Sequence, residues 1–499
     1  MRKLLTFALL LVGLGVTAQV IPSDRQISWA TWTGVSGGLP VRSTVFTNMV
    51  GLDNTGATDV SAAINNALTA CPSNQVVAVP AGTFLVTNQI WIPGGVTLRG
   101  ASKSSTIFSL QRPAVRADGG IRLGSSADLA PSLLWTNAGL ALKGSTNLSL
   151  LTTNGLAIGN IVAIEQINDT NWVFNYSQDG SSGSQDLHAT TSLTNYGIAQ
   201  YIKVLTISST NITFEPPLNF TYTNSLNCRL FRRGSSNWPR LATLESCTVS
   251  TPTNKFTTSW QRNVQFAFAD EAGMRDVAIN SYERYGAYLT AAYRCTIQDC
   301  DFIGTNLGGS GGNYAIGLVF ASAFNRIENN WTSNAITSVV IGEMSQGNAI
   351  AYNFEAANYY SPTNWLQPSS SVHDCHPMYN LYEGNIFRMV GADMSHGNAS
   401  SQTYLRNRLY GWQEYKTSQL RAMFIDYGHF YYNIVGNVMG GPWVPYFSFT
   451  NGPAPSEVIS TTNVLMLVGY STGDGSGPLG QTYTNSFGHT NVFATRILS

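Results

Sequence analysis

The sequence predicts an all-β fold, a single-stranded right-handed parallel β-helix, and three observations favour this fold class. A short pattern that ends in Asn returns five times between Asn325 and Asn437. Each repeating unit holds an apolar run of strand length. No unit contains the apolar spacing of an amphipathic helix. Units of this size without helices are typical of a β-solenoid, in which each unit forms one turn.

The repeated pattern has a polar residue first, an apolar or aromatic residue two places on, and an Asn five places on. Its copies begin at Asn325, Asn348, Asn380, Gln402 and Tyr432. The starts are 23, 32, 22 and 30 residues apart, so a turn of roughly constant size carries loops of variable size. Asn tolerates the left-handed bend of a tight corner. We therefore expect the final asparagines to lie in a row at one corner, each about one strand spacing from the next: Asn330, Asn353, Asn385, Asn407 and Asn437.

A sixth copy of the pattern has Cys in both Asn places and reads Cys295-Ile297-Cys300. The chain has 6 cysteines among 499 residues, which is too few for a disulfide framework. No cysteine pair has the CxxC spacing of a metal site. We expect Cys295 and Cys300 to stack in the interior of the solenoid.

The composition indicates a surface that is polar but weakly charged. Hydrophobic residues make up 43% of the chain and charged residues 11%, so Asn, Ser, Thr and Gly must cover much of the surface. Such a surface suits a neutral polar ligand. The formal net charge is zero and the sequence has no long basic run, which argues against nucleic acid as a partner.

Residues 1–18 have the pattern of a secretory signal peptide. The basic residues Arg2 and Lys3 precede an apolar run over residues 4–16, and small residues offer a cleavage site before Gln19. We therefore expect the protein to be secreted, or to act in the periplasm or at the cell surface. No later apolar run reaches ~18 residues, so we expect no membrane span. We also expect a monomer.

Residues 19–139 are expected to form an N-terminal cap and the first coils of the solenoid. One face of the predicted helix carries Val60, Ala63, Ile64, Ala67, Leu68 and Cys71. Pro72 ends this helix, which can cover the open edge of the solenoid. Short strands are expected next at residues 76–79, 83–86, 90–92 and 96–98.

The rest of the chain divides into three parts. Residues 140–238 interrupt the repeat with longer strands and predict a small inserted β subdomain. This subdomain either walls one side of a sugar-binding surface or has no part in it. Residues 239–445 form the main coils, and residues 446–499 form a C-terminal tail rich in Gly, Ser and Thr.

Three segments near the start resemble a known group of proteins. They are NTGATD at residues 54–59, VPAGTF at 79–84 and VTLRG at 96–100. Together with the helix, they are similar to the opening of the pectate-lyase-like superfamily, especially its rhamnogalacturonase and epimerase-like branch, which is related to glycoside hydrolase family 28. The resemblance implies a right-handed β-helix that acts on an acidic or neutral polysaccharide. It does not fix the reaction, because hydrolases, lyases, epimerases and binding proteins share this fold.

Polar residues in successive coils predict an active site. Adjacent parallel strands lie only ~4.8 Å apart, so equal places in successive coils become neighbours. Six places before the start of each repeat, three consecutive coils carry Asp374, His396 and Asp426. The following places add one carboxylate and two imidazoles: Glu343, His376 and His429. Such a column also forms for structural reasons, but the convergence of acids and imidazoles favours catalysis.

The order of three of these residues adds to the resemblance. Glu343, Asp374 and His396 are similar to the acidic, acidic, Gly-His-Gly succession of glycoside hydrolase family 28, although the last motif reads Ser-His-Gly here. The resemblance implies Asp374 as the general acid, Glu343 as the base and His396 as the residue that tunes them. Hydrolysis of a pectin-like polysaccharide, without a cofactor, is therefore the favoured function.

Two other functions stay open. β-Elimination on a uronate needs a base, for which His396 or His376 would serve, and a cation on the uronate carboxylate. The candidate cations are Arg388, Arg406 and Arg408, with a divalent cation such as calcium as a cofactor of that reaction. A non-catalytic glycan-binding protein needs mainly aromatic platforms for sugar rings. The candidate platforms are Trp365, Trp412 and Tyr415. The sequence identifies no metal-ligand residues.

Overall fold

The computed structural model describes residues 21–111, 119–169, 197–234, 237–253, 262–305, 312–374, 376–393, 397–426, 429–440, 449–450, 466–470 and 496–498. The expected signal peptide, residues 1–18, and most of the expected C-terminal tail lie outside these residues. Within the described part, no helix is long and apolar enough to cross a membrane.

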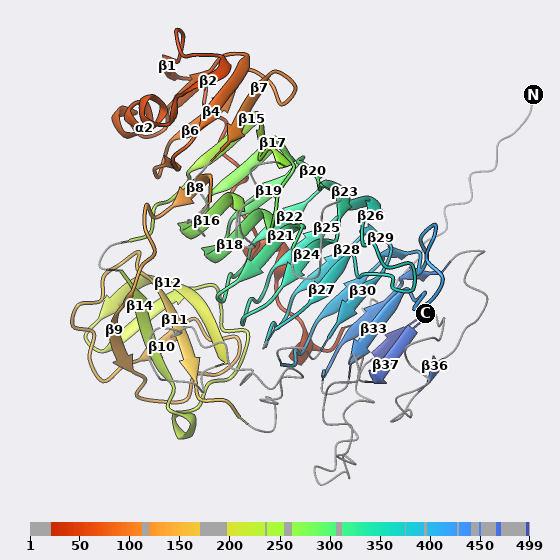
Figure 1. Ribbon diagram of the computed structural model, residues 1–499. Coiled ribbons are helices and arrows are strands. Elements are labelled where there is room, and N and C mark those ends of the chain that lie inside the picture. The colour runs from red at the N-terminus through yellow and green to blue at the C-terminus, as the bar shows by residue number, and fades with distance from the viewer. Residues whose placement is uncertain are drawn as a thin grey trace, which may run out of the picture.

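The chain forms a long solenoid whose N-terminal coils lie at one end and whose C-terminal coils lie at the other (Figure 1). Sheet A contains β1 (Val45–Asn48), β2 (Thr55–Asp59), β3 (Val76–Val79), β4 (Gly82–Val86), β6 (Thr97–Gly100), β7 (Thr106–Leu110), β15 (Thr243–Ser250), β17 (Gly273–Asn280), β19 (Thr296–Gln298), β20 (Asp301–Ile303), β22 (Arg326–Glu328), β23 (Trp331–Ala335), β25 (Ala349–Ala351), β26 (Phe354–Asn358), β28 (Leu381–Glu383), β29 (Ile386–Phe387), β31 (Thr403–Leu405), β32 (Arg408–Leu409), β34 (Asn433–Val435), β35 (Val438–Met439) and β38 (Arg496–Leu498).

Sheet B forms a second wall of the solenoid. It contains β5 (Ile90–Ile92), β8 (Ile121–Gly124), β16 (Arg262–Asp270), β18 (Tyr285–Tyr293), β21 (Tyr314–Val319), β24 (Thr337–Ile341), β27 (Ser370–Val372), β30 (Val390–Ala392), β33 (Met423–Asp426), β36 (Phe449–Thr450) and β37 (Met466–Tyr470). A coil of the main solenoid contributes two strands to sheet A and one to sheet B, as β22, β23 and β24 do.

The repeated apolar residue of each coil fills the core. The strand register stacks Ile327, Ile350, Tyr382, Tyr404 and Ile434 from one coil to the next. All five are buried, and the rings of Tyr382 and Tyr404 stack with their centroids 4.6 Å apart. Each stacked side chain is removed from water when two coils pack together, and this burial is the main force that holds the coils together.

Two ladders of asparagine side chains run along the inside of the corners. In the first ladder, the Nδ2 group of each Asn donates to Oδ1 of the next, at 2.8–3.0 Å, through Asn330, Asn353, Asn385, Asn407 and Asn437. The same Oδ1 atoms also accept backbone N–H groups. The expected row at one corner is thus confirmed. A second ladder joins Asn325, Asn348 and Asn380, the polar residues that start the pattern.

The prediction that the repeated Asn itself takes the left-handed bend of the corner is wrong. The left-handed residue of each corner is the one before the ladder Asn, for example Asn329 at φ 55°, Tyr352 at φ 56° and Gly384 at φ 64°. The ladder asparagines are instead selected because one amide both donates and accepts. Each side chain can therefore satisfy buried backbone groups of two neighbouring coils.

Cys295 and Cys300 take the same places in the preceding coil. Both are buried and free, as expected, and their N–H groups donate to Oδ1 of Asn325 and Asn330. Because Cys has no side-chain amide, each ladder of asparagine side chains ends at this coil.

The N-terminal residues form a cap and a strap. Helix α2 (Ser61–Ala70) buries Ile64 and Leu68 against the first coils, which agrees with the expected capping helix. Before it, the segment with η1 (Ser23–Arg25) and α1 (Trp29–Trp32) runs along several coils. Trp29 donates from its indole N–H to the carbonyl of Tyr379 at 2.6 Å. Further along the segment, Arg42 donates to Thr97 and Thr243.

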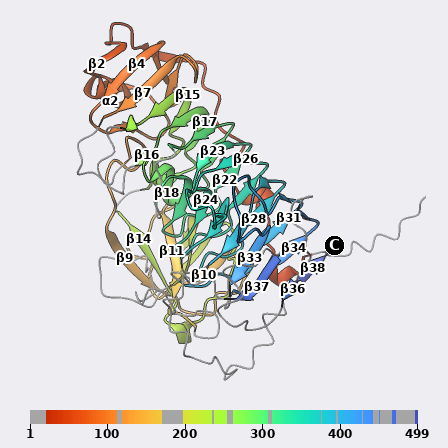
Figure 2. The same ribbon diagram turned by 45° about the vertical axis from the view of Figure 1, so that its right-hand side comes forward.

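An inserted subdomain stands beside sheet B (Figure 1, Figure 2). Its antiparallel sheet C contains β9 (Pro131–Thr136), β10 (Asn147–Ser149), β11 (Ile161–Gln166), β12 (Ile198–Ser208), β13 (Asn211–Glu215) and β14 (Arg229–Arg233), with η2 (Asn224–Leu226) before β14. The first strand begins at Pro131, earlier in the chain than the expected start at 140. The described residues between 295 and 437 contain no helix. The predicted β-helix with a capping helix and an inserted β subdomain is confirmed.

Candidate active site

The candidate site lies on the outer face of sheet B. The strand register aligns four buried apolar residues: Ile341, Val372, Ala392 and Ile425. Side chains alternate along a strand, so the residues that directly follow these four face outward. We name them the outer column: Gly342, His373, Asp393 and Asp426.

The outer column differs from the column expected from the sequence. Asp426 lies in it, but Asp374 follows His373 by one residue, so the expected alignment of Asp374 with Asp426 is wrong. His396, the third expected member, lies outside the described residues. Asp374 instead takes the place equivalent to Glu343 in the previous coil, because the N–H of His373 donates to the carbonyl of Ile341. The structure therefore places two carboxyl groups on adjacent coils.

Asp374 and Glu343 form a close carboxyl pair. The side chain of Asp374 lies over Gly342, where a β-carbon would overlap its Oδ2 atom. The backbone of Asp374 has φ 94°, well outside the usual left-handed value near 57°. The Oε2 atom of Glu343 accepts the N–H of Phe320 at 3.1 Å. Burial, together with the negative charge of Asp374, raises the pKa of Glu343 to about 8, so this carboxyl keeps its proton at neutral pH.

His373 pairs with Asp393 in the outer column. The Nδ1 atom of His373 lies 2.9 Å from both carboxylate oxygens of Asp393, and the hydroxyl of Ser371 donates to the same carboxylate. Burial alone would lower the pKa of His373. The charges of Asp393 and Asp374 outweigh burial and raise this pKa to about 10. His373 is therefore an imidazolium that neutralises the carboxylates on either side of it.

His376 and His429 are buried and neutral. Burial and the charge of His429 lower the pKa of His376 to about 3, and burial lowers the pKa of His429 to about 4. The Nδ1 atom of His429 accepts the N–H of Ala399 at 3.0 Å, so its proton must sit on Nε2, which lies 3.2 Å from the carbonyl of Asp393. His429 thus fixes the backbone of Asp393. Neither imidazole has the exposure or the pKa of a catalytic base.

Asp426 has a different setting from Asp374. It is 2% exposed, and the guanidinium of Arg421 lies close enough for its charge to act on Asp426. Arg421 is buried as well, and its side chain lies over the ring of Phe424, 5.3 Å from the centroid. Burial lowers the pKa of Arg421 to about 10, and Asp426 opposes that shift. This pair indicates a structural part for Asp426.

An aromatic cluster adjoins the carboxyl pair on preceding strands. The rings of Tyr285 and Tyr288 have centroids 4.6 Å apart, and those of Tyr285 and Tyr314 lie 5.5 Å apart. Arg262 lies over Tyr288, and Arg284 lies over Tyr285 and Tyr314. Arg262 acts electrostatically on Glu343, and Arg284 acts on His373, which places both cations near the acidic residues.

The arginines expected to bind a uronate lie elsewhere. Arg406 is 64% exposed and forms an ion pair with Glu383 at the corner of the first asparagine ladder. Arg388 and Arg408 both lie over the ring of Tyr410, at 5.4 Å and 4.9 Å. Arg388 also donates to the carbonyl of Ala356. None of these contacts brings the three arginines to the carboxyl pair.

The expected aromatic platforms lie on two loops that contact each other. Lys416 and Thr417 bond to backbone groups of the loop over residues 360–363. Trp365 donates to Gln367, Trp412 packs against a buried cluster that includes Phe424 of β33, and Tyr415 is 80% exposed. Through Trp412, this loop pair borders the amino ends of the sheet B strands.

The inserted subdomain borders the carboxyl ends of the same strands. Asn219 donates to Gln346 at 3.1 Å, and Tyr293 donates from its hydroxyl to the carbonyl of Glu215. Gly197 abuts the His376 ring, because a β-carbon on residue 197 would lie 2.8 Å from the Cδ2 atom of that ring. If this subdomain walls the site, its loop over residues 168–184 should approach the same face, but that loop lies mostly outside the described residues.

Sequence reasoning missed His373, Asp393 and the arginine and tyrosine cluster. The predicted column lies a fixed number of places before each Asn repeat, but the loop between the sheet B strand and the repeat varies in length. Counting forwards from the apolar end of each strand would have found His373 and Asp393, because each directly follows an apolar or small strand end, Val372 and Ala392.

Within the described residues, no group of three or more His, Cys, Asp or Glu side chains has a metal-binding arrangement. Calcium as a cofactor of a lyase reaction stays a prediction from the sequence.

Comparisons with known proteins bear on the fold. The chain is similar to tailspike gp61 of Pseudomonas phage phi297, with 13% identity and a TM-score of 0.51 over 78% of this chain and 62% of that one. It is also similar to tailspike Gp54 of Acinetobacter baumannii bacteriophage AP22, with 11% identity and a TM-score of 0.48 over 77% of this chain and 55% of that one. The chain thus spans less than two thirds of either tailspike. At these identities the likeness shows the fold alone.

One family model matches the sequence. Residues 47–267 match the family described as rhamnogalacturonase A/epimerase, pectate lyase-like. No curated protein matches the chain. The matched range contains the NTGATD, VPAGTF and VTLRG segments and the capping helix α2. The chain is therefore a right-handed parallel β-helix protein, and its residues 47–267 are similar to the family described as rhamnogalacturonase A/epimerase, pectate lyase-like.

Proposed function

We propose that this protein hydrolyses a pectin-like polysaccharide on the outer face of sheet B, with Glu343 as the general acid and Asp374 as the base or nucleophile. The observation that carries this proposal is the carboxyl pair itself. Asp374 lies over Gly342, the residue directly before Glu343. Two carboxyl groups in unlike environments are what glycoside hydrolysis requires.

The electrostatics of the pair support this choice of the two roles. Glu343 keeps a proton at neutral pH and can give it to the glycosidic oxygen as the bond to the anomeric carbon breaks. Asp374 either takes a proton from the water that attacks this carbon, or attacks the carbon directly to form a glycosyl ester. In the second case water then cleaves that ester and gives its proton to Glu343, which restores both carboxyl groups. These roles reverse the assignment made from the sequence, in which Asp374 was the acid and Glu343 the base.

His373 supports Asp374 in this scheme. Its imidazolium is held by Asp393 and lies close enough to Asp374 for the two charges to interact. A fixed positive charge next to Asp374 favours the ionised form that a base or nucleophile needs. Asp393 acts here through His373, and His429 acts through the backbone of Asp393.

Two features favour an acidic polysaccharide. The guanidinium groups of Arg262 and Arg284 lie near the carboxyl pair, and guanidinium binds carboxylates in a bidentate way. The adjoining tyrosines, of which Tyr314 is partly exposed, can contact the apolar face of a sugar ring. The name of the matched family, rhamnogalacturonase A/epimerase, supports the same substrate class.

The test is an activity assay on defined polysaccharides. Polygalacturonate, rhamnogalacturonan and neutral galactan would be incubated with the full chain, and new reducing ends and the ultraviolet absorbance of unsaturated products would both be measured. We expect reducing ends without that absorbance. Asp374→Asn and Glu343→Gln should each lower the rate by at least ~10²-fold, while the melting temperature stays nearly unchanged. Asp128→Asn, at an exposed carboxylate that pairs with the buried Arg122, is the matched control and should keep full activity.

Other outcomes would identify the alternatives. Reducing ends together with the absorbance would mean β-elimination, and binding without products would mean a glycan-binding protein. Full activity of Asp374→Asn on a verified substrate would rule out the proposed pair.

A further inference from the structure

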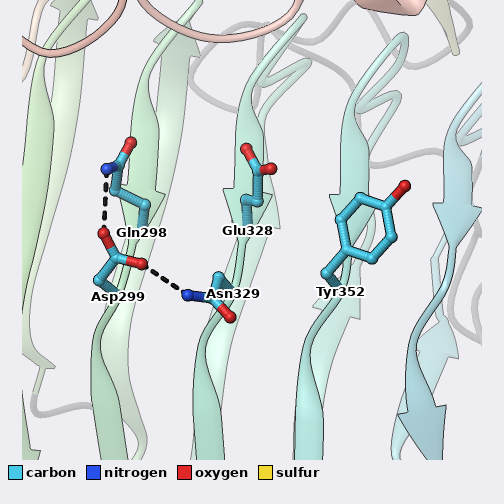
Figure 3. Close-up of a pocket in the computed structure, with 5 residues that line it drawn as sticks. All are labelled: Gln298, Asp299, Glu328, Asn329 and Tyr352. Atoms are coloured by element: carbon cyan, nitrogen blue, oxygen red, sulfur yellow. Dashed lines mark hydrogen bonds between the residues drawn. The ribbon is translucent and has the colours of Figure 1, made fainter.

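A second candidate sugar site lies on another face of the solenoid. A surface pocket of about 330 Å³ is lined by Gln298, Asp299, Glu328, Asn329 and Tyr352 (Figure 3). These residues come from three successive coils, at the corner that carries the first asparagine ladder. Three coils span roughly 10 Å between the outer strands, which is enough for one or two sugar rings.

Tyr352 supplies an exposed aromatic face in this pocket. The residue is 52% exposed, although tyrosine is usually mostly covered. The ring lies against Gly384 of the next coil, where a β-carbon would come within 2.6 Å of Cε1. Because residue 384 lacks a side chain, the ring can lie along the surface. A ring in this position presents an apolar face with fixed orientation.

The polar side chains beside the ring are held in place. Gln298 donates to Asp299 at 3.1 Å, and Asn329 donates to the other carboxylate oxygen of Asp299 at 2.7 Å (Figure 3). Beneath them, the ladder amides of Asn330 and Asn353 fix the corner backbone. The amides and carboxylates of the pocket thus form an ordered set of donors and acceptors for hydroxyl groups, as neutral sugars require.

The charge of this corner selects between classes of sugar. Asp299 and Glu328 line the pocket, and Glu383 lies beside it within 3.5 Å of the Tyr352 hydroxyl. Two cations lie at this corner against these three carboxylates, and both are paired: Arg406 with Glu383, and Arg326 with Glu328 at 3.9 Å. A uronate carboxylate would be repelled here, whereas a neutral sugar would not.

We propose that the Tyr352 corner is an accessory binding site for a neutral glycan chain, with the sugar ring stacked on Tyr352 and its hydroxyl groups bonded to Asp299, Glu328 and Asn329. This site lies apart from the carboxyl pair, and it does not depend on the reaction at sheet B. Its part would be to hold the protein on a polysaccharide that carries neutral segments.

The test measures binding, not catalysis. The full chain would be run in native gels that contain galactan, arabinan, xylan or polygalacturonate, and its retardation would be compared with that of variants. Tyr352→Asn suits this purpose, because residue 352 has φ 56° and Asn accepts that backbone, as the equivalent Asn329 shows. Phe354→Ala is the matched control, since Phe354 is an exposed aromatic residue, 40% exposed, two places further on.

We expect at least one neutral polysaccharide to retard the protein. Tyr352→Asn should weaken that binding roughly 5-fold or more, and Phe354→Ala should leave it unchanged. Neither variant should alter binding of polygalacturonate. The proposal is overturned if none of the neutral polysaccharides binds, or if Tyr352→Asn binds them as the native chain does. Because the readout is retardation, loss of catalysis in the carboxyl-pair variants would leave this result unaffected.

Discussion

The carboxylate of Asp374 occupies the space that a β-carbon on Gly342 would need. Gly342 stands in the outer column, one coil before His373, and Glu343 follows it directly. Glycine at this place therefore lets a carboxyl group from the next coil approach Glu343. The charge of Asp374 then helps to raise the pKa of Glu343, so the glycine is part of what makes the two carboxyls unlike.

Gly342→Ala should therefore lower activity strongly without removing any polar group. The new methyl group must push Asp374 away, and displacement of a reacting group by about 1 Å can cost about 10²-fold in rate. We expect the loss in kcat, measured on the polysaccharide that the native protein cleaves. Gly391→Ala is the control, because a β-carbon there also meets a neighbour, the ring of Phe424, but no carboxylate. Equal losses in both variants would show that the effect is general strain.

Activity should decline as the pH rises through about 8. The general acid must be protonated, and the pKa of Glu343 is about 8, so the alkaline limb of kcat/KM reports this group. Removing the negative charge of Asp374, as in Asp374→Asn, should lower the pKa of Glu343 and move that limb to lower pH. Asp393→Asn, which leaves His373 without its anionic partner, should change the profile, because the pKa of His373 near 10 depends on Asp393. A limb that stays in place in a partially active Asp374→Asn variant would contradict this origin.

The same group makes stability depend on pH. The pKa of Glu343 in the folded chain, about 8, lies above its ordinary value of 4.5, so its contribution is fully present below 4.5 and is lost as the pH rises through 8. His373 adds a similar loss, which begins only above its ordinary value of 6.5. Glu343→Gln should therefore remove this falling contribution. Between pH 4.5 and 6.5 the melting temperature of the variant should rise more steeply with pH than that of the native chain, because His376 and His429 gain stability over that range, and above pH 6.5 only the fall due to His373 should remain. An unchanged slope between pH 4.5 and 6.5 would show that Glu343 is ionised in the folded chain.

His429 should make the protein sensitive to acid. Its pKa in the folded chain, about 4, lies below the ordinary 6.5, so the unfolded chain binds a proton more readily and stability is lost as the pH falls from 6.5 to 4. The loss is on the order of 3 kcal/mol. His429→Gln keeps an acceptor and a donor but cannot take up a proton, so its melting temperature should fall less between pH 7 and pH 4. His376, with a pKa of about 3, should account for much of the remaining loss.

The fold could be predicted from the sequence because the ladder position admits few residue types. Asn330, Asn353 and Asn385 each donate and accept at a buried corner, so the same residue recurs and marks every coil. The surrounding apolar residues fill the core and are equally repetitive. Nothing in a single sequence separates this ladder from the left-handed residue beside it, which explains why the role of Asn was misread.

The site could be predicted only in part, because loop lengths vary between the strand and the next repeat. From the last aligned apolar residue to the repeat start there are 7 places after Ile341, 8 after Val372, 10 after Ala392 and 7 after Ile425. Counting back by a constant number therefore misplaced Asp374 by one residue and His396 by three, and kept Asp426. Glu343 and Asp374 came together in space through the glycine at 342, which no spacing rule reveals.

The asparagine ladder should make a larger contribution to stability in its middle than at its end. Asn353 donates to Ile327 and Asn385, each at 3.0 Å, and its Oδ1 atom accepts two N–H groups of Asn330. Asn353→Ala leaves those buried groups without partners, at a cost of about 3–6 kcal/mol. Asn437 ends the described ladder and is partly exposed, so water can replace the side chain in Asn437→Ala and the cost should be about 1 kcal/mol.

The measurement is the melting temperature of each variant at one fixed heating rate, because a solenoid of many coils need not unfold in a single reversible step. Asn353→Asp separates the two halves of the amide. It keeps the acceptor for Asn330 but loses the donor to Ile327 and Asn385 and places a charge inside the corner, so it should be at least as damaging as Asn353→Ala. If Asn353→Ala and Asn437→Ala melted together, the ladder would be a consequence of the coil geometry and not one of the forces that hold it.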